Sequence, residues 1–170
     1  MPRSAALRAS SAGASASSRP RGPARPSPAQ PSHGKTTRRG ERERLLILVA
    51  EDSVDTREMY LEYLAHVGFD TATAVNGQEV LDKARALGPD AIVMDLRMPG
   101  IDGLQATRAL RADPRTHLIP VIACTGRAFE EEQLIARDAG CDRVLVKPCM
   151  PEDVVAALRA LQIYAPGDPR

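Results

Sequence analysis

A series of short apolar runs, each closed by a polar residue, is the feature that most constrains the fold of this chain. A run of this kind is typical of a strand buried on both faces of a parallel sheet. Four runs have this form: 45–50 closed by Glu51 and Asp52, 91–94 closed by Asp95, 121–124 closed by Thr125, and 144–146 closed by Lys147. A fifth strand is predicted over 69–74, where apolar and polar residues alternate as in an edge strand.

Segments with apolar residues at helical spacing separate the predicted strands. Ser53 and Asn76 are placed to cap two of these helices, and Gly68 and Gly140 are placed to end two. Strands that alternate with helices favour right-handed crossovers and a parallel sheet. We therefore predict an α/β domain with five strands and five helices.

The polar residues that close the strands predict a binding site. The carboxyl ends of parallel strands meet at one edge of the sheet, where ligands bind in such folds. Glu51, Asp52, Asp95, Thr125 and Lys147 are therefore expected to lie together. Three adjacent carboxylates repel one another, and a hard cation that takes oxygen ligands, such as Mg²⁺, relieves this repulsion.

The charge distribution divides the chain into two parts. Residues 1–44 contain ten Lys and Arg against two Glu, whereas residues 45–170 contain thirteen Lys and Arg against twenty acidic residues. The first part is rich in Ala, Ser and Pro and has too few aliphatic residues to offset the entropy lost on folding. We predict a disordered basic arm over 1–44, a folded domain over 45–163 and a frayed C-terminus over 164–170. The arm is interpreted first as a solvated tail without a specific role. A tether to nucleic acid, anionic lipid or the acidic body of the same protein, an organellar transit peptide and a wrongly assigned start are the alternatives.

The cysteines and the hydropathy pattern bear on location. Cys124, Cys141 and Cys149 are odd in number and lack metal-ligand spacing, so they predict reduced thiols and a cytoplasmic location. No apolar stretch approaches the roughly 20 residues that a membrane span needs. No association with a membrane is therefore expected.

The closing residues resemble, in order and spacing, the receiver domain of two-component response regulators. The resemblance extends from Leu45 to Gln162. Four motifs carry it: Glu51–Asp52, Asp95–Gly103 (Asp-Leu-Arg-Met-Pro-Gly-Ile-Asp-Gly), Thr125–Gly126 and Lys147–Pro148. It implies a five-stranded parallel sheet in the order 2-1-3-4-5 with helices on both faces, which is the flavodoxin-like three-layer arrangement.

The resemblance also implies a role for each site residue. Asp95 is the expected phosphorylation site, and Mg²⁺ is the expected cofactor. The expected metal ligands are Asp52, Asp95, the backbone carbonyl of Arg97 and, through a water molecule, Glu51. Thr125, Gly126 and Lys147 are expected to contact the phosphoryl group.

Two further positions follow from the same resemblance. The Lys147–Pro148 bond matches the cis peptide of the family. Val144 occupies the position where many receivers carry an aromatic switch residue, so the usual coupling between the threonine and that residue is in doubt.

The resemblance implies a histidine kinase or a histidine phosphotransfer protein as phosphoryl donor. A downstream protein, unidentified by the sequence, reads the change in conformation. The helix near 130–139, the last strand and the last helix form the expected output or homodimer surface. Because few residues follow Gln162, a stand-alone receiver without a DNA-binding domain is expected. Its chemistry is limited to its own phosphorylation and hydrolysis, so we do not expect an enzyme.

Three other classes compete with this interpretation. Val144 and the arginines at 97 and 127 motivate a receiver-like interaction module that works without phosphorylation. A phosphohydrolase of the haloacid-dehalogenase type needs a second Asp two residues after the nucleophile, but Arg97 stands there. A dinucleotide-binding fold is disfavoured because no glycine-rich loop follows the first strand.

Overall fold

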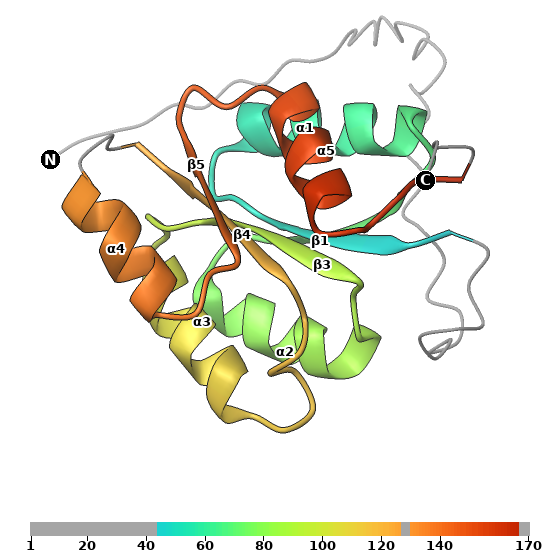
Figure 1. The fold of residues 1–170 in the computed structure, drawn as a ribbon. Coiled ribbons are helices and arrows are strands. Elements are labelled where there is room, and N and C mark those ends of the chain that lie inside the picture. The colour runs from blue at the N-terminus through green and yellow to red at the C-terminus, as the bar shows by residue number, and fades with distance from the viewer. Residues whose placement is uncertain (1–43, 127–129, 167–170) are drawn as a thin grey trace, which may run out of the picture. The chain divides into compact units, whose positions relative to one another are not determined.

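The computed structural model describes residues 44–126 and 130–166 of the 170-residue chain. This described part forms one five-stranded parallel sheet in the order β2-β1-β3-β4-β5. The strands are β1 (Leu46–Ala50), β2 (Asp70–Ala74), β3 (Ala91–Asp95), β4 (Val121–Thr125) and β5 (Arg143–Val146). The helices are α1 (Val54–His66), α2 (Gly77–Leu87), α3 (Gly103–Ala112), α4 (Glu130–Asp138) and α5 (Pro151–Ala160). The predicted fold class and strand order are confirmed (Figure 1).

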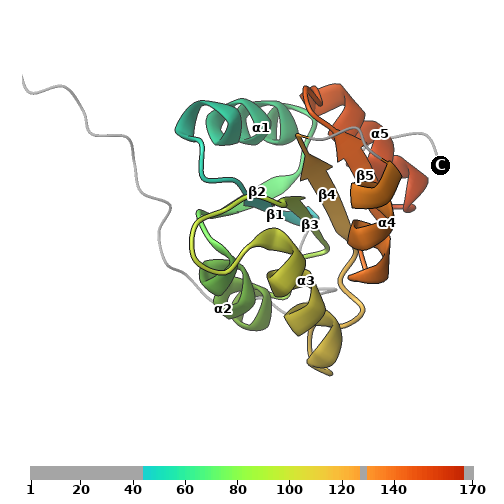
Figure 2. The same cartoon turned by 90° about the vertical axis from the view of Figure 1, so that its left-hand side faces the viewer.

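Helices cover both faces of the sheet. Figures 1 and 2 show α1 and α5 on one face and α2, α3 and α4 on the other. Alternate residues of β1 therefore enter different cores: Ile47 and Val49 pack on the α1 and α5 side, and Leu48 and Ala50 pack on the opposite side. Burial on both faces explains why the central strands are continuous apolar runs.

The carboxyl ends of the central strands are aligned by the sheet register. Asp95 pairs with Cys124, and Thr125 pairs with Val146. β3 and β4 thus extend one residue beyond the predicted apolar runs, because the backbone ladder continues through the polar residue. Asp95 and Thr125 are therefore held by the sheet and do not belong to loops.

Side-chain caps start the helices that follow two of these strand ends. The Ser53 hydroxyl accepts a hydrogen bond from Thr56 N at 3.4 Å at the start of α1. Asp102 accepts one from Gln105 N at 2.7 Å and donates its own N–H to the Gln105 side chain at the start of α3. Such caps satisfy amide groups that have no partner inside the helix. They fix where the chain turns after β1 and after the loop that follows β3.

Some predictions concern residues that the structure does not describe. Residues 1–43 of the predicted basic arm, and residues 167–170 of the predicted frayed C-terminus, lie outside the described residues. Within the described part of the C-terminal segment, Ile163 and Ala165 are buried among core residues. Among the described residues, no helix combines the length and the hydropathy that crossing a membrane requires. The predicted cytoplasmic location stays a prediction.

Candidate functional site

Three carboxylates from two strand ends form the centre of the candidate site. Glu51, Asp52 and Asp95 each offer one carboxylate oxygen, and these oxygens lie within 4.8 Å of one another. Glu51 and Asp95 are 2% and 6% exposed, whereas Asp52 is exposed. The structure thus brings the three predicted acids together and leaves one of them open to solvent.

Lys147 supplies the positive charge of the site. Its Nζ donates to Asp95 Oδ2 at 2.7 Å and to Glu51 Oε2 at 2.8 Å. Burial alone would lower the pKa of this ammonium, but the hydrogen bonds to Asp95 and Glu51 outweigh burial and raise the pKa. Burial also raises the pKa of the Glu51 carboxyl, because the hydrogen bond from Lys147 offsets the cost of desolvation only in part.

The remaining oxygens of the two buried acids accept backbone amides. Asp95 Oδ1 accepts from Arg97 N at 2.9 Å, and Glu51 Oε1 accepts from Ser53 N at 3.3 Å. Each carboxylate oxygen still has a second lone pair. Together with the exposed Asp52, these oxygens make a donor set that suits a hard cation such as Mg²⁺. The predicted ligand role of the Arg97 carbonyl stays a prediction.

The start of α3 packs directly against the end of β3. A Cβ atom added to Gly103 would lie 2.8 Å from Leu96 Cα and would also overlap the Asp95 carbonyl oxygen. Gly103 N also donates to Leu96 O at 3.2 Å. The absence of a side chain at Gly103 therefore lets α3 support the backbone that carries Asp95.

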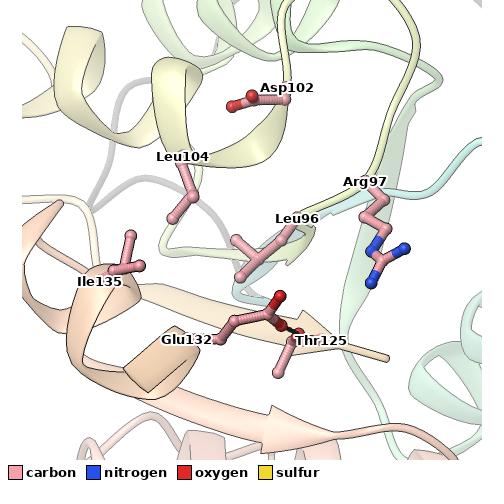
Figure 3. Close-up of a pocket in the computed structure, with 7 residues that line it drawn as sticks. All are labelled: Leu96, Arg97, Asp102, Leu104, Thr125, Glu132 and Ile135. Carbon is pink, nitrogen blue, oxygen red and sulfur yellow. Dashed lines mark hydrogen bonds between the residues drawn. The ribbon is translucent and has the colours of Figure 1, made fainter. Parts of the chain in front are cut away.

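Thr125 closes β4 beside this cluster. Its carbonyl oxygen accepts from Lys147 N at 2.7 Å, which joins the ends of β4 and β5. Its hydroxyl, in a residue only 1% exposed, donates to Glu132 Oε2 of α4 at 3.1 Å (Figure 3). Both residues line a cavity of about 240 Å³ together with Leu96, Arg97, Asp102, Leu104 and Ile135. The next residue, Gly126, is exposed, and a Cβ atom added there would have no atom of the described residues within 4 Å.

Two residues that contact the site are not predicted by the sequence analysis. Arg57 of α1 donates from Nη1 to the carbonyl oxygens of Glu51 and Asp52, at 2.8 and 3.3 Å. Glu132 contacts Thr125, although its place in a run of three acids at a helix start indicates only a favourable interaction with the helix dipole. Neither contact leaves a signal in the sequence, because both depend on how the helices pack on the sheet.

The other predicted positions lie as follows. The Lys147–Pro148 peptide bond is cis. Val144 of β5 is partly buried and packs against the core on the α2, α3 and α4 side. Arg127, which with Arg97 and Val144 motivates the module that works without phosphorylation, lies outside the described residues.

Comparisons with known proteins agree with this geometry. A family model for the response regulator receiver domain matches residues 47–159. The DNA-binding response regulator MtrA of Mycobacterium tuberculosis is 34% identical over 114 residues, which are 67% of this chain and 49% of that protein. The transcriptional regulatory protein PrrA of the same organism is 37% identical over 115 residues, which are 68% and 48% of the two chains.

Solved structures show the same fold. The chemotaxis response regulator CheY4 of Vibrio cholerae aligns with a TM-score of 0.66 and 28% identity, covering 69% of this chain and 98% of that one. The receiver domain of the sensor histidine kinase PA1611 from Pseudomonas aeruginosa aligns with a TM-score of 0.64 and 28% identity, covering 69% and 96%. That structure contains a magnesium ion coordinated in its active site cleft.

The expectation of a receiver that works without a DNA-binding domain is wrong. It rests on the short segment after Gln162, whereas MtrA is named as a DNA-binding response regulator and PrrA as a transcriptional regulatory protein. The chain spans about half the length of these curated relatives. A receiver fold buries its own core, so the end of its last helix carries no information about a separate output domain.

Proposed function

Because the chain belongs to the response regulator receiver domain family, we propose that Asp95 is a phosphoryl acceptor in two-component signalling. The observation that carries the proposal is the Asp95 carboxylate itself. It lies at a strand end, 2.7 Å from the Lys147 ammonium and next to two further acids. This arrangement offers an oxygen nucleophile, a fixed cation and oxygen ligands for a second cation within one small site.

The phosphoryl donor in this proposal is a phosphohistidine. An Asp95 carboxylate oxygen attacks phosphorus, a P–O bond forms, the P–N bond to the imidazole breaks, and the imidazole nitrogen takes up a proton. Lys147 stabilises negative charge on the transferred oxygens, and the Thr125 hydroxyl donates a hydrogen bond to one of them. Gly126 leaves space beside that oxygen, because it carries no side chain.

Asp52, Asp95 and Glu51 are the residues that would hold Mg²⁺. When bound, the metal would offset part of the negative charge on these carboxylates and on the phosphoryl oxygens. Support comes from the fit of the donor set and from the magnesium ion in the related PA1611 receiver. The resulting acyl phosphate shifts a conformational equilibrium that another domain or protein reads. Under this proposal the chain turns over no other substrate.

Phosphorylation by a small-molecule donor tests the proposal. The purified protein is incubated with acetyl phosphate and Mg²⁺, and the modified residue is located by mass spectrometry. We expect a phosphoryl group on Asp95 in the wild type and in Asp102→Asn, and none in Asp95→Asn. An unmodified Asp95 in the folded wild type would refute the proposal and favour a receiver-like module that works without phosphorylation.

A further inference from the structure

The hydroxyl of Thr125 donates a hydrogen bond to a residue of α4 in this structure. It donates to Glu132 Oε2 at 3.1 Å, and the dashed line in Figure 3 marks this bond between the end of β4 and the first turn of α4. A hydroxyl group has one hydrogen to donate. The hydrogen that a phosphoryl oxygen at the site would receive is thus directed to a helix instead.

The Glu132 carboxylate also lies on the side of the sheet where phosphoryl charge would be added. It lines one cavity with Leu96 and Arg97, the two residues that follow Asp95 in the chain. A phosphoryl group carries between about one and two negative charges at neutral pH and replaces the single charge of the Asp95 carboxylate, so phosphorylation adds up to about one negative charge to the site. Like charges repel, so a carboxylate that lines this cavity opposes the modified state.

We propose that Glu132 and the phosphoryl group on Asp95 compete for the hydroxyl hydrogen of Thr125, so that phosphorylation releases α4 from β4. This inference rests on the proposed phosphorylation of Asp95. It makes Glu132 a positioning residue that acts through Thr125 without touching the reacting atoms. It also gives the protein a path from the site to α4 that does not pass through position 144, where the aliphatic Val144 has no polar side-chain atom.

The coupling has to act in both directions. If phosphorylation weakens the contact between Thr125 and Glu132, that contact must equally disfavour phosphorylation, because two linked equilibria share one coupling free energy. Loss of the Glu132 acceptor should therefore favour the phosphorylated state and loosen α4 in the unmodified protein. Both consequences can be measured separately.

The test compares acetyl phosphate labelling of Glu132→Ala with that of Glu131→Ala. Glu131 is the matched control, because it is exposed in the same helical turn and its replacement removes the same charge. We expect Asp95 to be labelled about tenfold faster in Glu132→Ala, at the low end for the loss of one hydrogen bond to a charged acceptor. The rate in Glu131→Ala should stay within about twofold of the wild type, as for an exposed substitution. Glu132→Gln keeps an acceptor without the charge, and its rate should fall in between.

A double-mutant cycle tests whether the effect passes through Thr125. In a Thr125→Val background, the ratio of rates with and without Glu132→Ala should fall to less than half of its value in the wild-type background, because the shared hydrogen bond is already absent and only charge repulsion remains. Hydrogen exchange provides a readout without phosphorylation. Amides of α4 should exchange faster in unmodified Glu132→Ala than in Glu131→Ala, and phosphorylated wild type should resemble Glu132→Ala.

The outcomes separate this inference from the proposed function. If the wild type is labelled at Asp95 but Glu132→Ala is no faster than Glu131→Ala, competition for the hydroxyl is refuted and the phosphoacceptor role stands. The same holds if the acceleration is undiminished in the Thr125→Val background. If the wild type is not labelled at Asp95, the proposed function fails and this inference fails with it.

Discussion

Lys147 Nζ lies 2.7 Å from Asp95 Oδ2, although the two residues are 52 positions apart in the chain. The same ammonium lies 2.8 Å from Glu51 Oε2, which is 96 positions away. One lysine thus joins the ends of β1, β3 and β5. It neutralises part of the charge on two buried carboxylates that would otherwise repel each other.

Removing this ammonium should destabilise the fold. Lys147→Ala leaves Glu51 and Asp95 buried without their cation, and we expect the free energy of unfolding to fall by about 2 kcal/mol, a value reduced for the partial exposure of the lysine. Mg²⁺ should restore part of the loss, because it supplies positive charge to the same oxygens. Urea denaturation with and without MgCl₂ measures both effects.

The control for this experiment is Lys83→Ala. Lys83 pairs with Glu79 at 2.7 Å, but both side chains are more than a third exposed, at 38% and 39%. An exposed pair of this kind contributes about 0.5 kcal/mol. If both alanine variants lose the same stability, the contribution that we assign to the buried cluster is wrong.

Asp52 should be needed for the effect of Mg²⁺ on thermal stability. A cation that binds only the folded state raises the melting temperature with concentration. Because Asp52 is the exposed member of the acidic cluster, Asp52→Ala should lose most of this rise while keeping the fold. Asp55→Ala, an exposed acid in the first turn of α1, should keep the full rise. Equal magnesium responses in the two variants would place the cation elsewhere.

A methyl group at Gly103 should destabilise the fold, whereas one at Gly126 should not. The Cβ atom of Gly103→Ala would lie 2.8 Å from Leu96 Cα, and neither backbone can move away without displacing the end of β3. We expect a loss of about 2–3 kcal/mol in the free energy of unfolding. Gly126→Ala places its methyl in open space and should change stability by less than about 0.5 kcal/mol. Chemical denaturation of both variants decides whether α3 packs on β3 as closely as described.

The ion pairs of Asp113 predict a pH-dependent contribution to stability. Hydrogen bonds from Arg115, through both its side chain and its backbone, and from Arg85 hold the pKa of this carboxyl well below its usual range. A lowered folded-state pKa stabilises the protein above the unfolded pKa of about 3.9, and the contribution is lost as the pH falls toward the folded value. Asp113→Asn should therefore lower the melting temperature at pH 7, and the difference should shrink below about pH 4.

Salt provides the check on that interpretation. The Asp113 pairs lie at the surface, so high salt should screen them and reduce the difference between wild type and Asp113→Asn at pH 7. Thermal melts at low and high NaCl measure this change. A difference that is the same at every pH and salt concentration would show that the asparagine acts through its shape and not through the missing charge.

The strands could be predicted from the sequence because burial on both faces requires a continuous run of apolar residues. A strand covered on both faces must be apolar at every position, so Leu46–Ala50 and Ala91–Met94 stand out without any tertiary information. Polar residues at the ends of such strands then predict which side chains meet, because parallel strands share one carboxyl edge. This argument alone predicts that Asp95 and Lys147 lie together.

The contacts made by helices were decided only by the tertiary structure. Arg57 and Glu132 lie on helix surfaces where charged residues are ordinary, and nothing in their local sequence distinguishes them from Glu58 or Glu131. Their partners are set by how far along the sheet each helix sits and how it is rotated about its axis, which depends on the packing of the whole core. The sequence alone therefore determined the buried strands and which polar side chains stand at their carboxyl ends. Only the folded structure decided which helix holds Thr125, because that contact depends on a spatial relationship that no local pattern encodes.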